Sequence, residues 1–144
     1  MILHGLFGMG RNWATIAKAL SETYRVLTLD LRNHGASPWD DAMDYPLMAD
    51  DVAKLIETQF AGPVAVIGHS MGGKAAMALA CERPNLVERL CVVDIAPVPY
   101  EHTFAAHLDA MADMNTKALT RRTDAEAIIA NAIDDRPTAQ FLSR

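Results

Sequence analysis

The sequence has little cysteine and few aromatic side chains: it contains two cysteines, and aromatic residues make up 6% of its 144 positions. Cys81 and Cys91 form neither a CxxC motif nor a disulfide framework, and their apolar neighbours predict buried, reduced thiols. Long apolar runs are missing too, because stretches such as residues 63–67 and 90–93 fall far short of the roughly 18 residues of a membrane span. The chain also opens without the basic and then apolar residues of a secretory leader. These absences predict a cytoplasmic protein that does not enter the membrane.

Positive charge is scarce as well. The formal net charge is −5 at pH 7 and no basic patch is present, which argues against nucleic acid or an anionic membrane surface as a partner. No HExxH motif, paired His/Cys spacing or dinucleotide-binding fingerprint occurs, so no metal or organic cofactor is implied. In contrast, hydrophobic residues make up 51% of the chain, enough to exclude disorder and to build the core of one domain.

Short apolar runs and helical periods alternate along the first two thirds of the chain. Three short apolar runs are predicted to be buried parallel strands. Residues 25–30 end at a polar residue, residues 63–67 end just before a glycine, and residues 90–93 end just before a polar residue. Apolar residues recur at helical spacing in residues 13–20 and 48–60. The alternation predicts an α/β fold with a mostly parallel sheet flanked by helices.

The helix limits can also be predicted. Asp44 and Pro46 are typical of the start of the helix over residues 48–60, and the Ala- and Gly-rich segment 71–81 predicts a helix that stops before Pro84.

The pattern changes near Pro99, where prolines interrupt the alternation. The remaining third of the chain is predicted to be helical without strands, over residues 103–119, 123–133 and 137–142. We therefore expect two parts, a core portion at residues 1–98 and a helical cap segment at residues 99–144.

A glycine-rich turn links an expected strand to an expected helix and fits two patterns. Residues 68–72 read G-x-S-x-G, the turn that presents a nucleophilic serine, here Ser70. Residues 68–74 also read G-x-x-x-x-G-K, the phosphate-binding loop of nucleotide-binding proteins. The second interpretation is weakened by Ala75, because that position needs a hydroxyl group to ligate magnesium. Under the first interpretation, Lys74 is a solvated or structural lysine.

Two other turns favour the nucleophile interpretation. Residues 1–3 are apolar and are expected to end a strand, and residues 4–8, directly after them, are the kind of turn that supplies a backbone N–H to an oxyanion. The two donors would be the N–H groups of Leu6 and Met71. Residues 30–37 read D-x-R-x-x-G-x-S, which has no role in a phosphate-binding protein, and Asp30 is expected to hold this loop.

Together with residues 92–98, these turns resemble the α/β-hydrolase family, and within it the YbfF-type esterases and ABHD11-like hydrolases. The resemblance covers essentially the whole chain and depends on four motifs in the right order and spacing. It implies a truncated α/β-hydrolase core and a serine hydrolase that cleaves carboxylic esters of short to medium acyl groups through an acyl-enzyme on Ser70. It also implies that Asp94 is the catalytic acid; the alternative is an aspartate at a strand end that accepts hydrogen bonds from loop amides. Thioesters are a second substrate class, because Arg32 and Lys74 are available to meet phosphate.

The catalytic base is the open point. In the family the catalytic histidine lies near the C-terminus, whereas this chain is expected to end inside the cap and to lack the first strands of the core. Of the five histidines, His4, His34 and His69 lie in turns and are expected to be structural. His102 and His107 are then the candidates for an improvised base. The alternative is a catalytically incomplete remnant that lacks this histidine.

The cap segment carries many apolar side chains, which are expected mainly to pack the cap onto the core. They are Phe104, Leu108, Met111, Met114, Leu119 and Ile128. A cap without the strands that normally hold it would expose apolar surface, so we expect a homo-oligomer.

Overall fold

The computed structural model describes residues 1–100, 104–112, 114, 119, 121–133 and 136–143. They form two compact units, Met1–Val98 and Pro99–Arg144. Each unit is described by itself.

The first unit is built on a four-stranded parallel sheet with the strand order β2-β1-β3-β4. The strands are β1 (Ile2–Leu3), β2 (Thr28–Leu29), β3 (Val64–His69) and β4 (Val87–Val93). The predicted parallel sheet is therefore confirmed. The expected strand at residues 25–30 is much shorter than predicted, because only Thr28 and Leu29 pair with β1, which itself has two residues.

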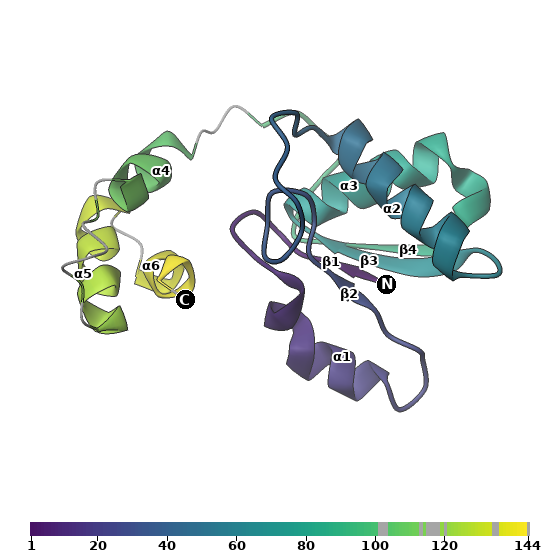
Figure 1. The fold of residues 1–144 in the computed structure, drawn as a ribbon, viewed down its shortest axis with the longest axis horizontal. Helices are drawn as coiled ribbons and strands as arrows, with labels where there is room; N and C mark the ends of the chain where they lie inside the picture. Colours follow the sequence, from purple (N-terminus) through teal and green to yellow (C-terminus); the bar gives the residue numbers. More distant parts are fainter. Residues whose placement is uncertain (101–103, 113, 115–118, 120, 134–135, 144) are drawn as a thin grey trace. The chain divides into compact units, whose positions relative to one another are not determined.

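Helices cover both faces of this sheet (Figure 1). On one face lie α2 (Tyr45–Gln59) and α3 (Met71–Glu82), and on the other lies α1 (Ala14–Leu20), which follows the short 3-10 helix η1 (Gly10–Trp13). A second 3-10 helix, η2 (Pro84–Leu86), leads into β4.

The start of α2 confirms the predicted helix signals. The Asp44 carboxylate accepts a hydrogen bond from the Leu47 N–H at 2.8 Å, and Pro46 stands in the first turn. An N-terminal cap of this kind satisfies a backbone donor that the helix itself leaves unpaired.

The core lies between the sheet and the α2–α3 face. Its buried apolar residues come from both helices, from β1 and β3, from η2 and from the loop after β2: Leu3, Leu31, Met48, Ala49, Val52, Ala53, Ile56, Val66, Met71, Ala75, Ala76, Leu79 and Leu86. The small side chains of α3 let that helix lie close to β3. Burial of this apolar surface is the main source of stability for the unit.

The prediction of two buried thiols was wrong, because Cys81 and Cys91 are both exposed. Cys91 belongs to β4, an outer strand whose middle residues, from Glu88 to Cys91, face solvent. Cys81 lies in the last turn of α3, on the side away from the buried Leu79. Apolar neighbours in sequence do not bury a side chain when the element places it on an outer face.

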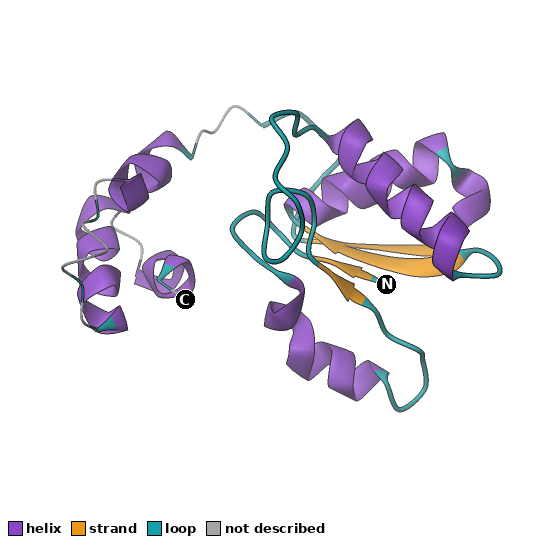
Figure 2. Ribbon diagram, viewed as in Figure 1, coloured by secondary structure: helices purple, strands orange, loops and turns teal. Residues whose placement is uncertain are grey.

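The second unit consists of α4 (Ala105–Ala112), α5 (Arg122–Ile133) and α6 (Arg136–Leu142), drawn in green to yellow in Figure 1 and as purple helices in Figure 2. Its fully buried side chains include Ile129 and Ala139. Of the helix predicted over residues 103–119, the structure describes Ala105–Ala112 as helical, while residues 103, 113 and 115–118 lie outside the described part of the chain. In the described residues, no helix has the length and apolar character needed to cross a membrane.

Candidate active site

Polar residues follow each of the four strands at the same edge of the sheet. His4 follows β1, Asp30 follows β2, and Ser70 and Asp94 follow β3 and β4. The register pairs Leu3 with Gly68 and His69 with Val93, so the carboxyl ends of the strands lie side by side. In parallel sheets this is the edge at which ligands bind.

Ser70 stands at a sharp turn between β3 and α3. Its φ of 49° and ψ of −117° lie in a region that non-glycine residues rarely adopt. The turn is held by the Ser70 N–H, which donates to the Val93 carbonyl at 3.0 Å, and by the Ser70 carbonyl, which accepts from the Gly73 N–H at 2.8 Å. This is the geometry that the G-x-S-x-G interpretation predicts for a nucleophile turn.

Gly72 is required because α3 approaches β1 closely. A Cβ atom at this position would lie 2.5 Å from the His4 carbonyl oxygen and 2.6 Å from that of Leu3. These neighbours are backbone atoms that have no freedom to move aside. The small residue therefore lets the helix that follows Ser70 pack directly on the end of β1.

The turn after β1 lies beside Ser70. A Cβ atom on Gly5 would lie 3.3 Å from the Ser70 Cβ. The Gly8 N–H donates to the Gly5 carbonyl at 3.0 Å, and the Phe7 N–H donates to His34 Nε2 at 3.2 Å. The N–H groups of Leu6 and Met71, by contrast, have no acceptor among the described residues.

The phosphate-binding interpretation of residues 68–74 does not fit this turn. The N–H groups of Gly73 and Lys74 both donate to the Ser70 carbonyl and are not available to a phosphate. The Lys74 ammonium group donates to the Val98 carbonyl. Lys74 is therefore a structural lysine, as the nucleophile interpretation predicts.

Asp94 follows β4, next to the sharp turn at Ser70. It has a φ of 56°, and 84% of its side chain is exposed. Its carboxylate Oδ2 lies 3.7 Å from His69 Nε2. Ser70 and Asp94 are thus two strained residues on neighbouring strand ends, and such strain concentrates at functional sites.

His4 is buried and fully paired. Its side chain is 1% exposed, its Nδ1–H donates to the Gly5 carbonyl at 2.8 Å, and its Nε2 accepts from the Leu31 N–H at 3.0 Å. The ring lies 5.0 Å from that of His34. Burial is the main reason that the pKa of His4 is below its usual value. The expected structural role of His4 agrees with these contacts.

Asp30 holds the loop that follows β2, as predicted. Its carboxylate accepts from the Gly10 N–H at 2.7 Å and from the Ala36 N–H at 2.9 Å, while its carbonyl accepts from the Ser37 hydroxyl at 2.6 Å. The hydrogen bonds from Ala36 and Gly10 lower the pKa of Asp30.

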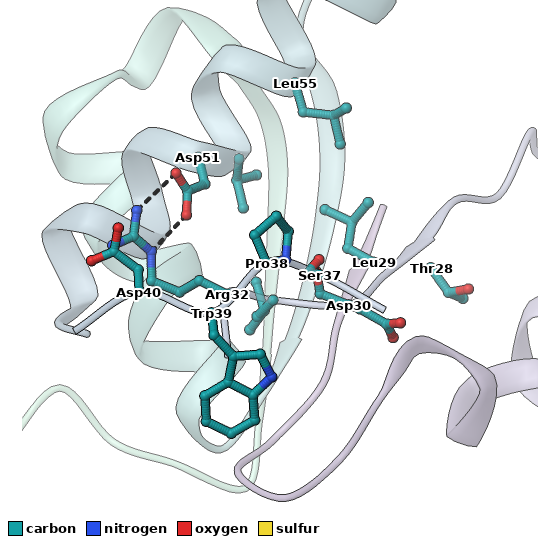
Figure 3. A pocket seen from close by; sticks show the side chains of 12 residues that line it. Thr28, Leu29, Asp30, Arg32, Ser37, Pro38, Trp39, Asp40, Asp51 and Leu55 are labelled. Carbon is teal, nitrogen blue, oxygen red and sulfur yellow. Dashed lines mark hydrogen bonds and ion pairs between the residues drawn. The ribbon is translucent and has the colours of Figure 1, made fainter. Parts of the chain in front are cut away.

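A groove of about 490 Å³ lies beside β2 and was not predicted from the sequence. Figure 3 shows the Arg32 guanidinium paired with the Asp51 carboxylate, at 2.7 and 2.9 Å, and the Trp39 indole projecting from the same loop. Arg32 also donates to the Ala42 carbonyl. Across the described ranges, no three His, Cys, Asp or Glu side chains gather closely enough to hold a metal ion.

The two candidate bases lie in the second unit. His102 falls outside the described residues. His107 lies in α4, where its ring is 5.5 Å from that of Phe104 and its buried Nδ1 has no hydrogen-bond partner within the described part of the chain. The role of either residue as a base stays a prediction.

A parallel sheet with a serine at a strained turn between a strand and a helix is the arrangement typical of α/β hydrolases. Residues 1–137 match the family profile described as the alpha/beta hydrolase fold, so the chain belongs to the α/β-hydrolase family, as the motifs predict.

Individual relatives include esterases and a lipase. The chain is 41% identical to the sn-1-specific diacylglycerol lipase ABHD11 of Xenopus laevis, over 99% of this chain and 48% of that protein. It is 36% identical to the esterase YbfF of Escherichia coli, over 99% of this chain and 56% of that protein. A solved marine microorganism esterase is 38% identical and superposes with a TM-score of 0.90, covering 98% of this chain and 56% of that one. The chain thus spans about half the length of these relatives.

Proposed function

We propose that this chain carries the nucleophile of a serine hydrolase that cleaves carboxylic esters of short to medium acyl groups. The observation that carries the proposal is the strained turn that presents Ser70 beside residues 4–8. The names of the relatives, among them an esterase and a diacylglycerol lipase, support an ester as the substrate class. Residues 1–98 would form the catalytic core portion, and residues 99–144 the cap.

The proposed reaction has two halves. The Ser70 hydroxyl attacks the ester carbonyl carbon and its proton passes to a histidine, forming a tetrahedral intermediate whose oxyanion accepts hydrogen bonds from the N–H groups of Leu6 and Met71. The C–O bond to the alcohol then breaks, and the alcohol leaves with the proton. Water hydrolyses the acyl-enzyme by the same steps. Asp94 is the proposed acid that orients the histidine.

The base is proposed to be His102 or His107. Replacing each by Ala and measuring the turnover of a p-nitrophenyl ester tests this assignment. We expect one of the two variants to lose about 100-fold or more in rate, the order of magnitude for loss of a general base. Unchanged rates in both variants would rule both residues out.

Thioesters remain a second proposed substrate class, but only because Ser70 would attack their acyl carbonyl as it attacks that of an ester. Arg32 pairs with Asp51 and Lys74 donates to Val98. Because both cations have internal partners, they do not support recognition of a coenzyme phosphate, which was the sequence-based reason for thioesters.

Labelling with a fluorophosphonate probe tests the nucleophile. We expect the chain to be labelled, and we expect Ser70→Ala to remove the label completely while its thermal unfolding stays cooperative. Lys74→Ala serves as a matched control in the same turn, and it should keep the label. A folded wild-type chain that takes up no label would overturn the proposal and favour a catalytically incomplete remnant.

The chain is further proposed to self-associate. Large apolar side chains of the second unit are exposed, with Phe104 at 38%, Leu108 at 53% and Ile128 at 42%. These three side chains lie at the surface of the second unit, which supports an apolar face that another copy would cover. Light scattering at micromolar concentration should give a mass above that of the monomer. A well-folded monomer would contradict this expectation.

A further inference from the structure

His69 is the residue directly before the nucleophile, and the proposed reaction gives it no role. Its side chain is about one third exposed, 36%, at the carboxyl edge of the sheet. Three groups surround it, and each belongs to a different part of the candidate site. They are Gly5 in the turn after β1, Trp13 at the end of η1, and Asp94 after β4.

The contact with Gly5 is the tightest of the three. A Cβ atom on Gly5 would lie 2.9 Å from His69 Nδ1 and 3.3 Å from its Cε1. The imidazole ring therefore lies directly against the backbone of the turn whose next N–H, that of Leu6, is the proposed oxyanion donor. Any movement of the ring changes the space available to that turn.

The other two contacts hold the ring in place and connect it to the acid. Its centroid lies 5.9 Å from that of Trp13 at a tilt of 58°. Its Nε2 lies 3.7 Å from the Asp94 carboxylate. That separation is too long for a direct hydrogen bond but short enough for an electrostatic interaction.

We propose that His69 is a positioning residue whose ring sets the distance between the oxyanion turn at residues 5–8, Ser70 and Asp94. The proposal rests on the proposed function, since it concerns the same site. His69 touches no reacting atom in this role. Beyond the last backbone pairs of the sheet, its ring fills the space between Gly5, Trp13 and Asp94, and a displacement of about 1 Å in such a donor is costly to the reaction.

Two substitutions separate the contacts. His69→Phe keeps a ring against Gly5 and Trp13 and removes the nitrogen that faces Asp94. His69→Ala removes both. Trp39→Ala is the matched control, because it deletes an aromatic ring that is 81% exposed in the same unit.

The first measurement is backbone amide exchange by NMR, which does not depend on activity. The Phe7 and Gly8 amides report on the turn through their bonds to His34 and Gly5. We expect His69→Ala to speed their exchange about tenfold or more while the amides of α2 keep their rates, and we expect His69→Phe and Trp39→Ala to leave all these amides unchanged. Unchanged exchange at Phe7 and Gly8 in His69→Ala, or an equal rise throughout α2, would overturn the proposal.

The second measurement is the rate of fluorophosphonate labelling of the full chain. We expect a decrease of about 10- to 100-fold in His69→Ala, a smaller decrease in His69→Phe, and none in Trp39→Ala. If His69→Ala is labelled as fast as wild type, the positioning role is wrong although the proposed function stands. If the wild type takes up no label, the proposed function fails, and the exchange experiment alone decides whether His69 holds the turn.

Discussion

The two halves of the sheet edge use similar residues in opposite ways. After β1 and β2, the side chains of His4 and Asp30 are tied to backbone groups at both of their polar atoms. After β3 and β4, Ser70 and Asp94 adopt strained backbone conformations, and the Asp94 carboxylate is largely exposed. A polar residue at the end of a strand is thus structural where its hydrogen bonds are satisfied and available for chemistry where they are not.

The two aspartates show this difference most directly. Both follow a parallel strand and both stand at the same edge. Asp30 accepts hydrogen bonds from two backbone N–H groups, whereas the exposed Asp94 carboxylate faces a histidine nitrogen at 3.7 Å. The β1–β2 half therefore serves as a fixed frame beside the half that holds the proposed nucleophile and acid.

The largest loss of stability is expected where α3, which follows β3, packs on the end of β1. Gly72→Ala forces a Cβ onto the backbone carbonyls of Leu3 and His4, so we expect a loss of at least about 3 kcal/mol in the free energy of unfolding. Gly62→Ala is the control, because a Cβ there meets no atom within 4 Å. Urea denaturation measures both variants, and equal stabilities would refute the close packing of α3 on β1.

The β1–β2 half should also be sensitive to loss of His4. His4→Ala leaves the Leu31 N–H and the Gly5 carbonyl without their buried partner, and we expect a cost of about 2–3 kcal/mol. The measurement is again urea denaturation. His107→Ala offers a comparison, since it removes an imidazole whose Nδ1 has no partner in the described residues, and it should cost clearly less. A His4→Ala variant as stable as wild type would contradict the structural role of His4.

Replacing the two aspartates in turn sharpens the comparison. Asp30→Asn weakens two hydrogen bonds from backbone N–H groups, and we expect it to lower the free energy of unfolding by about 1–2 kcal/mol. Asp94→Asn should change stability by less than about 0.5 kcal/mol, as for other exposed side chains, yet slow ester hydrolysis. Thermal unfolding and turnover of the same two samples decide the matter. Similar losses of stability in both variants would erase the distinction between the halves.

The smallest effect is a dependence of stability on pH. Since burial lowers the pKa of His4 in the folded protein, the unfolded chain binds the proton more readily. The contribution of His4 to stability is therefore complete above about pH 6.5, the ordinary histidine value, and falls below it by at most about 1.4 kcal/mol per pH unit. The lowered pKa of Asp30 adds a second loss at more acidic pH, below the usual aspartate range.

Urea denaturation between pH 5 and 7.5 measures this slope. His4→Gln should flatten the curve in this range, while Asp30→Asn should leave it unchanged. A wild-type curve that is already flat from pH 7.5 to 5 would show that His4 does not titrate differently on folding.

Much of the fold was predictable because its signals are local. The spacing of apolar residues in α2 and the cap at Asp44 each depend on a few neighbouring positions. The same holds for the turn at Ser70, where Gly68 and Gly72 identify the sharp bend before the structure is known. Predictions that needed a partner from elsewhere in the chain were less successful, as the exposed Cys91 and the short β2 show.

By itself, the sequence determined the order of strands and helices, the place of the sharp turn at Ser70 and the family, since each follows from residue types at fixed spacing. Only the tertiary structure decided which polar groups are satisfied: that Asp30 is paired and Asp94 is exposed, and that Lys74 donates to Val98. It also brought the His69 ring against Gly5 and Asp94. The physical reason is that hydrogen bonding and burial depend on groups far apart in sequence, which meet only when parallel strands align their ends.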